Sequence, residues 1–183
     1  MEEQRAFLFQ VLEALEQTGL AYAITGSWAS TSYGLPRTTH DLDVVVAVTS
    51  EGAARLAAAF APPIYADAVW MAQAAAEGAG FNIIDPASGL KVDLWPLTDD
   101  AYAREQFGRR RQQTLFGRAV WMLAPEDVIL SKLLWYRQSE SDTQLRDCAS
   151  VWKLQKDTLD LDYLRRWAAQ LGLADLLKRV TAV

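Results

Sequence analysis

The sequence predicts an α+β protein, in which a small mixed β-sheet flanked by helices is followed by a C-terminal helical bundle. Residues 1–123 alternate strand-like and helix-like segments, whereas residues 124–183 carry only helical patterns. The chain has 183 residues, of which 51% are hydrophobic and seven are Trp, so it has enough apolar side chains for a packed core. We therefore expect a core region over residues 1–123 and a helical region over 124–183 that packs on it.

The first half of the chain contains the segments expected to build the sheet. Apolar residues at helical spacing and an acidic first turn predict a helix over 3–18 that ends at Gly19. A buried strand is expected at 22–25, and the helix after it ends at Gly34 and Pro36, because proline cannot continue a helix. The other expected elements are a strand at 42–48, helices at 51–60 and 69–76, a hairpin of strands 81–85 and 90–95, a helix at 99–107, and strands at 113–116 and 119–123.

Helical patterns occupy the rest of the chain. Pro125 in a first turn, followed by Glu126 and Asp127 at the positive end of the helix dipole, predicts a helix that runs to about Arg137. Further helices are expected at about 143–155, 160–171 and 173–181.

Charge and composition limit the classes of function. The net charge of −5 argues against a protein that grips long nucleic acid through many phosphate contacts. Arg109-Arg110-Arg111 is the only dense basic run, and such a run is commonly a solvated helix end or turn. A single Cys148 excludes an intramolecular disulfide, and with His40 as the only histidine a zinc site is not expected. The acidic start and the lack of a long apolar run predict a cytoplasmic protein with no membrane contact.

Three short motifs carry the expected chemistry. Gly26-Ser27 opens a helix, whose backbone N–H groups and serine hydroxyl suit an anion. Asp41 and Asp43 stand two residues apart at the start of a strand, so both carboxylates point to one face. Asp93, in the apolar strand 90–95, would join them on a neighbouring strand. Three carboxylates placed together can hold two Mg²⁺ ions, and Asp93 would then be a general base or a shared metal ligand.

These motifs resemble the nucleotidyltransferase superfamily, whose fold is that of DNA polymerase β. The string from Arg37 through Thr38-Thr39 to Asp41-Leu42-Asp43 looks more narrowly like the AbiEii-type toxin nucleotidyltransferases and their uncharacterised bacterial relatives. The resemblance covers roughly residues 20–171 and implies a nucleotidyltransferase core over 1–123. It also implies that Asp41, Asp43 and Asp93 bind two Mg²⁺ ions and catalyse the transfer of a nucleoside monophosphate from an NTP.

The same resemblance implies the residues that bind the nucleotide. They are Gly26, Ser27, Arg37, Thr39, Lys132 and Asp147. Lys132 lies among leucines, so it is expected either to snorkel or to point into a polar cleft. Trp95 is expected on the same strand face as Asp93, where it could stack a base.

The sequence does not decide which molecule accepts the nucleotide. The toxin-type resemblance implies RNA or tRNA, in which case Arg109–Arg111 would line the cleft and an antitoxin protein could be a partner. A small hydroxylated molecule, such as an antibiotic, fits the acidic composition better and would occupy a deep pocket walled by the C-terminal helices. A protein side chain as acceptor, and a catalytically inactive domain that only binds nucleotide as a partner subunit, are the remaining alternatives.

Overall fold

The structure is a computed structural model that describes residues 2–39 and 41–182, so His40 lies outside the described residues. Helices and strands alternate in the first part of the chain and helices alone follow, which confirms the α+β fold class. The chain forms two compact units: unit 1 comprises Met1–Ile24 and Thr39–Phe107, and unit 2 comprises Thr25–Thr38 and Gly108–Val183. The functional division expected at residue 123 stays a prediction.

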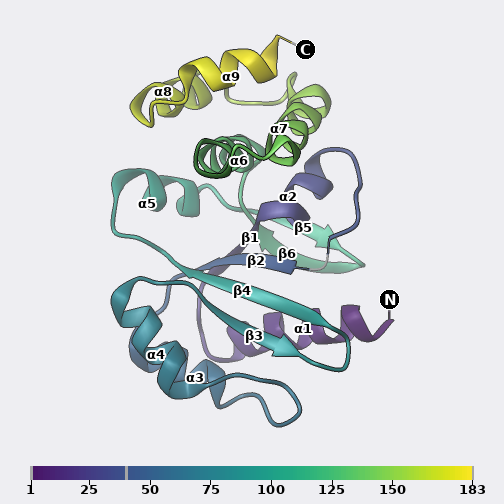
Figure 1. The fold of residues 1–183 in the computed structure, drawn as a ribbon, viewed down its shortest axis with the longest axis vertical. Coiled ribbons are helices and arrows are strands. Elements are labelled where there is room, and N and C mark those ends of the chain that lie inside the picture. The colour runs from purple at the N-terminus through teal and green to yellow at the C-terminus, as the bar shows by residue number, and fades with distance from the viewer. Residues whose placement is uncertain (1, 40, 183) are drawn as a thin grey trace. The chain divides into compact units, whose positions relative to one another are not determined.

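Unit 1 is a mixed sheet with helices on it (Figure 1). Strand β2 pairs in parallel with β4, β4 pairs antiparallel with β3, and the strand order is β3-β4-β2-β1. Helix α1 packs against β4, and α3 packs against α4, which in turn contacts β3. The elements of this unit are α1 (Glu2–Gln17), β1 (Tyr22–Thr25), β2 (Asp41–Val46), α3 (Ser50–Ala57), α4 (Ala68–Glu77), β3 (Phe81–Asp85), β4 (Leu90–Pro96) and α5 (Ala101–Gly108).

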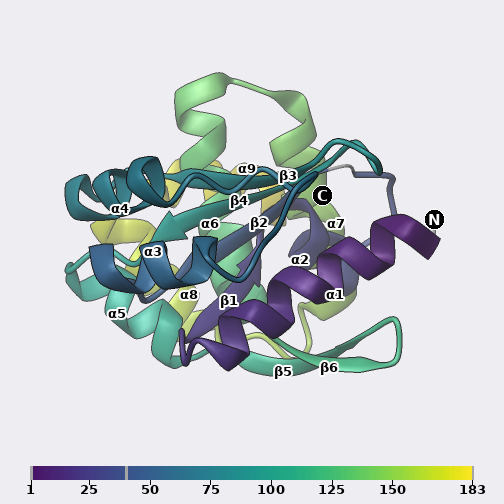
Figure 2. The ribbon, with the colours of Figure 1, turned by 90° about the horizontal axis from the view of Figure 1, so that it is seen from below.

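The two faces of this sheet differ in character because strand side chains alternate. One face is apolar and fully buried; its members include Leu42, Val44, Val46, Val92 and Leu94. Helices α1 and α3 lie on the near side of the strands in Figure 2. The opposite face of β2 and β4 is half-buried or exposed and carries all three aspartates singled out in the sequence. The alternation therefore separates the core from the polar face.

Unit 2 is built around helices (Figure 1). Helices α6 and α7 pack against each other, and α2 packs against both, while α8 contacts α6 and α9 contacts α7 and α8. Strands β5 and β6 form an antiparallel hairpin. The elements of this unit are α2 (Gly26–Tyr33), β5 (Arg111–Leu115), β6 (Arg118–Met122), α6 (Pro125–Ser139), α7 (Asp142–Gln155), α8 (Leu161–Gln170) and α9 (Ala174–Thr181).

Gly34 explains how closely α2 approaches α7. A Cβ atom at Gly34 would lie 2.1 Å from Ser150 Oγ and 2.8 Å from the Ser30 carbonyl oxygen, so only glycine fits without a shift. The backbone N–H of Leu35 donates to Ser150 Oγ at 2.7 Å, which fixes the end of α2 on α7. The glycine that the sequence marked as a helix end therefore also sets the packing distance.

The expected elements agree with the structure to within a few residues. The largest difference is the helix expected at 51–60, since α3 ends at Ala57. Pro62 disfavours helical geometry at Ala61, so it limits how far a helix can extend here but does not itself set the end of α3 at Ala57. In the described part of the chain, no helix combines the length and the apolarity needed to cross a bilayer.

Candidate active site

The three carboxylates of unit 1 lie on two adjacent strands. Asp43 of β2 stands directly opposite Asp93 of β4 in the parallel register, and Asp41 stands opposite Lys91. All of these residues have the same parity along their strands, so they share the polar face. The side chain of Asp93 is 18% exposed, which leaves its carboxylate accessible at the surface of the sheet. The structure thus brings the three predicted aspartates onto neighbouring positions.

A lysine that the sequence analysis did not single out belongs to this group. Lys91 Nζ lies 2.7 Å from Asp93 Oδ2. This hydrogen bond to Asp93 raises the pKa of Lys91 above its usual value, and the negative charges of Asp93, Asp41 and Asp43 act in the same direction, while partial burial opposes them. The signal was present in the sequence, because residues 91 and 93 are two apart in one strand.

Trp95 is held next to Asp43. Its indole Nε1 donates to Asp43 Oδ1 at 3.3 Å. Its ring packs on Gly80, where a Cβ atom would lie 2.7 Å from the ring carbons. The side chain is 36% exposed, so an apolar ring surface borders the carboxylates. The role in stacking a base stays a prediction.

The donor set of this face suits Mg²⁺, which prefers carboxylate oxygens and keeps water and substrate phosphates as further ligands. Among residues 2–39 and 41–182, no three His, Cys, Asp or Glu side chains are arranged as a ready metal site. Instead, the ammonium group of Lys91 binds the Asp93 carboxylate. The three aspartates are of the ligand type that Mg²⁺ prefers, and the metal site itself stays a prediction.

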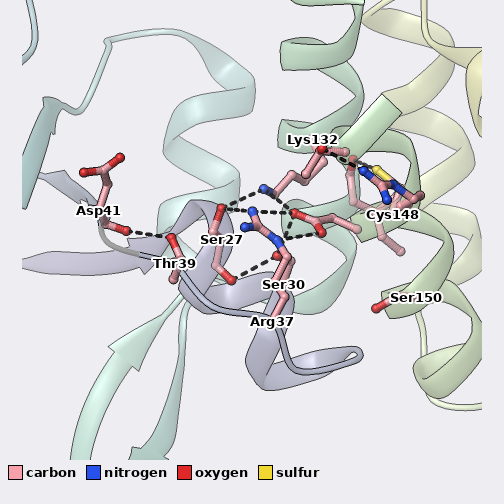
Figure 3. A network of polar contacts seen from close by, with 12 residues as sticks. Ser27, Ser30, Arg37, Thr39, Asp41, Lys132, Cys148 and Ser150 are labelled. Atoms are coloured by element: carbon pink, nitrogen blue, oxygen red, sulfur yellow. Dashed lines mark hydrogen bonds and ion pairs between the residues drawn. The ribbon is translucent and has the colours of Figure 1, made fainter. Parts of the chain in front are cut away.

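Unit 2 contains the phosphate-binding candidates, and Figure 3 shows Ser27, Arg37 and Lys132 converging. Arg37 Nη2 and Lys132 Nζ both donate to Ser27 Oγ, the latter at 3.4 Å. Lys132 Nζ also lies 2.8 Å from Asp147 Oδ2, and Arg37 Nε lies 3.1 Å from Asp147 Oδ1. Two cations and a hydroxyl are therefore gathered around a single carboxylate.

The charges of this cluster are largely buried. Lys132 is 3% exposed and Asp147 is 8% exposed. Burial by itself would raise the pKa of Asp147, but hydrogen bonds and charge from Lys132 and Arg37 outweigh it and hold that pKa below its usual value. Ser30 Oγ donates to the same carboxylate at 3.2 Å. Lys132 thus points inward to a polar cluster rather than snorkelling to solvent.

The other predicted nucleotide-binding residues have backbone roles. Gly26 begins α2 with φ of 62°, a left-handed conformation that side chains disfavour. The hydroxyl of Thr39 donates to the carbonyl oxygen of Asp41 at 3.3 Å, as the dashed line in Figure 3 marks. Thr39 therefore fixes the backbone at the start of β2.

Comparison with known proteins identifies the family. The sequence profile of the aminoglycoside-2''-adenylyltransferases matches residues 7–119. The chain belongs to this family. It is therefore a nucleotidyltransferase, and the expected superfamily is confirmed, whereas the matched family is not the AbiEii-type branch that the loop motif resembled. No curated protein sequence matches the chain significantly.

Solved structures support the fold. The solution structure of the antibiotic-resistance factor ANT(2'')-Ia is 16% identical, with a TM-score of 0.57 over 99% of this chain and 95% of that chain. The crystal structure of ANT(2'')-Ia in complex with adenylyl-2''-tobramycin is also 16% identical, with a TM-score of 0.59 over 93% and 97% of the two chains. An antigenic nucleotidyltransferase-like protein from Paracoccidioides brasiliensis is 16% identical, with a TM-score of 0.55 and coverage of 100% and 93%.

The arginine run has internal partners in unit 2. Arg109 contacts Glu126 at 3.2 Å and Asp127 at 3.5 Å, and its guanidinium lies 3.7 Å from the centre of the Tyr163 ring. Arg111 lies 3.7 Å from Glu126, and Arg110 stacks over the Trp121 ring at 5.1 Å. These arginines balance buried charges and cover aromatic rings, a role that their sequence run alone did not reveal.

Glu126 and Asp127 are the buried acids behind this arrangement. Both are fully buried, and the Tyr163 hydroxyl donates to Asp127 Oδ1 at 2.5 Å. Burial raises the pKa of Asp127 to about 7, against the opposing effects of the Tyr163 hydrogen bond and the Arg109 charge. The sequence marked these acids only as a helix start, because their partners are distant along the chain.

A groove of about 370 Å³ lies among the C-terminal helices α7, α8 and α9. Its lining residues are Trp152, Leu161, Leu164, Arg165, Ala168, Ala174, Leu177, Lys178 and Thr181. The groove is walled by C-terminal helices, as the sequence analysis expected of a small-molecule acceptor pocket, although none of its lining residues is a predicted site residue. Its use by an acceptor stays a prediction.

Proposed function

We propose that this chain transfers a nucleoside monophosphate from an NTP to a hydroxyl group of a small cationic acceptor such as an aminoglycoside, with Mg²⁺ as the metal ion. The observation that carries the proposal is the family match over residues 7–119, since this range contains Ser27, Arg37 and all three aspartates. A relative with the same fold is described with adenylyl-2''-tobramycin, the product of such a transfer.

The charge distribution supports a cationic acceptor. Unit 1 holds 14 Asp and Glu against 4 Lys and Arg, a net charge of −10, while unit 2 holds 9 against 14, a net charge of +5. An acidic surface attracts a polyamine sugar and repels a polyanion such as RNA. The basic unit contains the residues proposed to bind the triphosphate.

The phosphate-binding roles follow from the cluster in unit 2. Arg37 and Lys132 supply positive charge, and Ser27 supplies a hydroxyl at the start of α2, where free backbone N–H groups also favour an anion. Asp147 is itself an anion and would repel a phosphate, so we assign it to positioning the two cations rather than to contacting the nucleotide. Such preorganisation lowers the cost of binding.

The reaction is an in-line displacement at the α-phosphorus. The acceptor oxygen forms a bond to that phosphorus, the bond to the bridging oxygen of the β-phosphate breaks, and pyrophosphate leaves. Asp41, Asp43 and Asp93 would hold the metal, and Asp93 would also take the proton of the acceptor hydroxyl. When bound, Mg²⁺ neutralises charge on the phosphates and lowers the pKa of the attacking hydroxyl.

The position of the arginine run disfavours RNA as acceptor. Arg109 is only 25% exposed at its side chain and contacts three acidic residues. Arg111 contacts Glu126 as well. A run whose charges are matched inside unit 2 contributes little to phosphate contacts. The structure therefore gives no support to the toxin-type prediction, in which tRNA is the acceptor and an antitoxin protein is the partner.

The test is nucleotidyl transfer by the full chain. Each α-³²P-labelled NTP is incubated with Mg²⁺ and with either tobramycin or total tRNA, and labelled products are separated by chromatography. Asp41→Asn/Asp43→Asn is expected to abolish transfer. Asp99→Asn is the matched control, because it also removes a carboxylate from unit 1 but at a site 90% exposed and paired with Arg104.

Label on the aminoglycoside that requires Asp41 and Asp43 would support the proposal. Label on tRNA alone would overturn the acceptor class. Absence of transfer to either acceptor, in a protein whose circular dichroism spectrum shows a folded chain, would overturn the enzymatic proposal and favour a domain that only binds nucleotide.

A further inference from the structure

We propose that Lys91 is an internal counter-ion of the carboxylates on the polar sheet face, and that it weakens metal binding when no nucleotide is present. The inference rests on the proposed metal-dependent function and adds a determinant of when the metal binds. It assigns a role to a residue outside the predicted site, which comprised Asp41, Asp43 and Asp93.

The register places Lys91 inside the carboxylate group. It stands opposite Asp41 across the β2–β4 pair, and it precedes Asp93 by two residues on the same strand face. Its ammonium lies 2.7 Å from Asp93 Oδ2, the distance of a charge-assisted hydrogen bond. The side chain is 37% exposed, so it can leave this position without unfolding the strand.

Residues of β4 therefore occupy oxygens on both of the directly opposed carboxylates. Lys91 binds Asp93 Oδ2, and Trp95 Nε1 donates to Asp43 Oδ1 at 3.3 Å. Each carboxylate keeps further lone pairs, so a divalent ion can still bind, but it must do so beside the Lys91 ammonium or displace it. The positive charge of Lys91 therefore opposes the binding of a second cation to this group.

The charge balance gives the consequence for metal loading. Asp41, Asp43 and Asp93 carry three negative charges when ionised, and Lys91 reduces the net charge of the group to −2. A group with a net charge of −2 attracts a divalent ion less strongly than a group with a charge of −3. The negative charge of an arriving triphosphate restores this attraction, which agrees with the usual binding of Mg²⁺ by one or two carboxylates together with substrate phosphates.

The experiment measures Mn²⁺ binding to the full chain without nucleotide, by the loss of the free Mn²⁺ signal in electron paramagnetic resonance. Lys91→Met is expected to bind Mn²⁺ about tenfold more tightly than the wild type, since it removes a positive charge that lies 2.7 Å from an oxygen of the proposed ligand Asp93. Lys91→Arg keeps the charge and is expected to bind as the wild type does. Arg55→Met is the matched control, because it removes a cation of the same unit that pairs with Glu51 instead.

Added ATP is expected to reduce the difference between Lys91→Met and the wild type. Equal Mn²⁺ affinity of Lys91→Met and the wild type, with binding lost in Asp43→Asn, would overturn the role of Lys91 and leave the metal site intact. Weaker binding by Lys91→Met would also overturn it, because Lys91 would then support the metal ligands. Failure of every variant to bind Mn²⁺ would overturn the counter-ion inference, while the labelled-NTP assay judges the proposed transfer separately.

Discussion

Removal of the Asp147 carboxylate should destabilise the protein more than removal of its partner Lys132. In Asp147→Asn, the buried Lys132 ammonium loses its anionic partner and keeps neutral acceptors, namely Ser27 Oγ at 3.4 Å and the amide oxygen of the introduced asparagine. In Lys132→Met, Asp147 still pairs with Arg37 at 3.1 Å and accepts a hydrogen bond from Ser30 at 3.2 Å. The two halves of one ion pair therefore differ in how well the structure compensates for the missing partner.

The magnitude follows from burial. Breaking a buried pair by removing one partner costs about 3–5 kcal/mol, because the other charge is left uncompensated. Lys132 and Asp147 have side chains only 4% and 9% exposed, so we expect a loss of about 3 kcal/mol in Asp147→Asn. The loss in Lys132→Met should be about 1 kcal/mol, since the methionine retains the apolar stem and the carboxylate retains a cation.

Urea unfolding followed by tryptophan fluorescence measures both free energies. The double variant Asp147→Asn/Lys132→Met should lose less free energy of unfolding than the sum of the two single losses, because it leaves neither of these two charges without its partner. The native pKa of Asp147 is depressed, so its contribution to stability is present above the unfolded-state pKa and is lost as the pH falls through the native pKa. The reasoning would be refuted if Asp147→Asn had the same free energy of unfolding as the wild type at neutral pH, or if it lost less free energy of unfolding than Lys132→Met.

Three further predictions concern Asp127, Gly34 and Cys148. Folding raises the pKa of Asp127 from 3.8 to about 7, so its contribution to the free energy of unfolding is full below about pH 4 and is lost as the pH rises through 7. The free energy of unfolding should fall by roughly 4 kcal/mol over this range in the wild type, and Asp127→Asn, which cannot ionise, should lack the fall. Gly34→Ala should lower the unfolding free energy by about 1–3 kcal/mol, whereas Gly108→Ala, with open space at its Cβ, should not. Cys148 is buried, which raises the pKa of its thiol to about 12, so mass spectrometry should find it alkylated by iodoacetamide only in urea.

Much of the fold could be predicted from local patterns. Strand alternation alone placed Asp41, Asp43 and Asp93 on the polar face, because side-chain direction in a strand depends only on residue parity. Helix starts and ends also followed from short-range chemistry, as at Pro125 and Gly34. The physical cause in each case acts over a few residues, so the sequence contains it.

Partner choice could not be predicted in the same way. The sequence left Lys132 either snorkelling or pointing inward, and the packing of α6 on α7 decided it by placing Asp147 at 2.8 Å. From the sequence, Arg109–Arg111 could be a solvated patch or a nucleic-acid-binding patch. In the structure, the buried acids Glu126 and Asp127 pair with arginines of this run. These pairings join residues from separate elements, and charge patterns along the chain do not specify them.

The sequence by itself determined the order of elements, the polar face of the sheet and the residue types that phosphate and metal chemistry require. Only the tertiary structure decided which charges neutralise one another: Lys91 with Asp93, Lys132 and Arg37 with Asp147, and Arg109 with Glu126. The reason is physical, since backbone periodicity is local, whereas the energy of a charge depends on its burial and on partners that folding brings near.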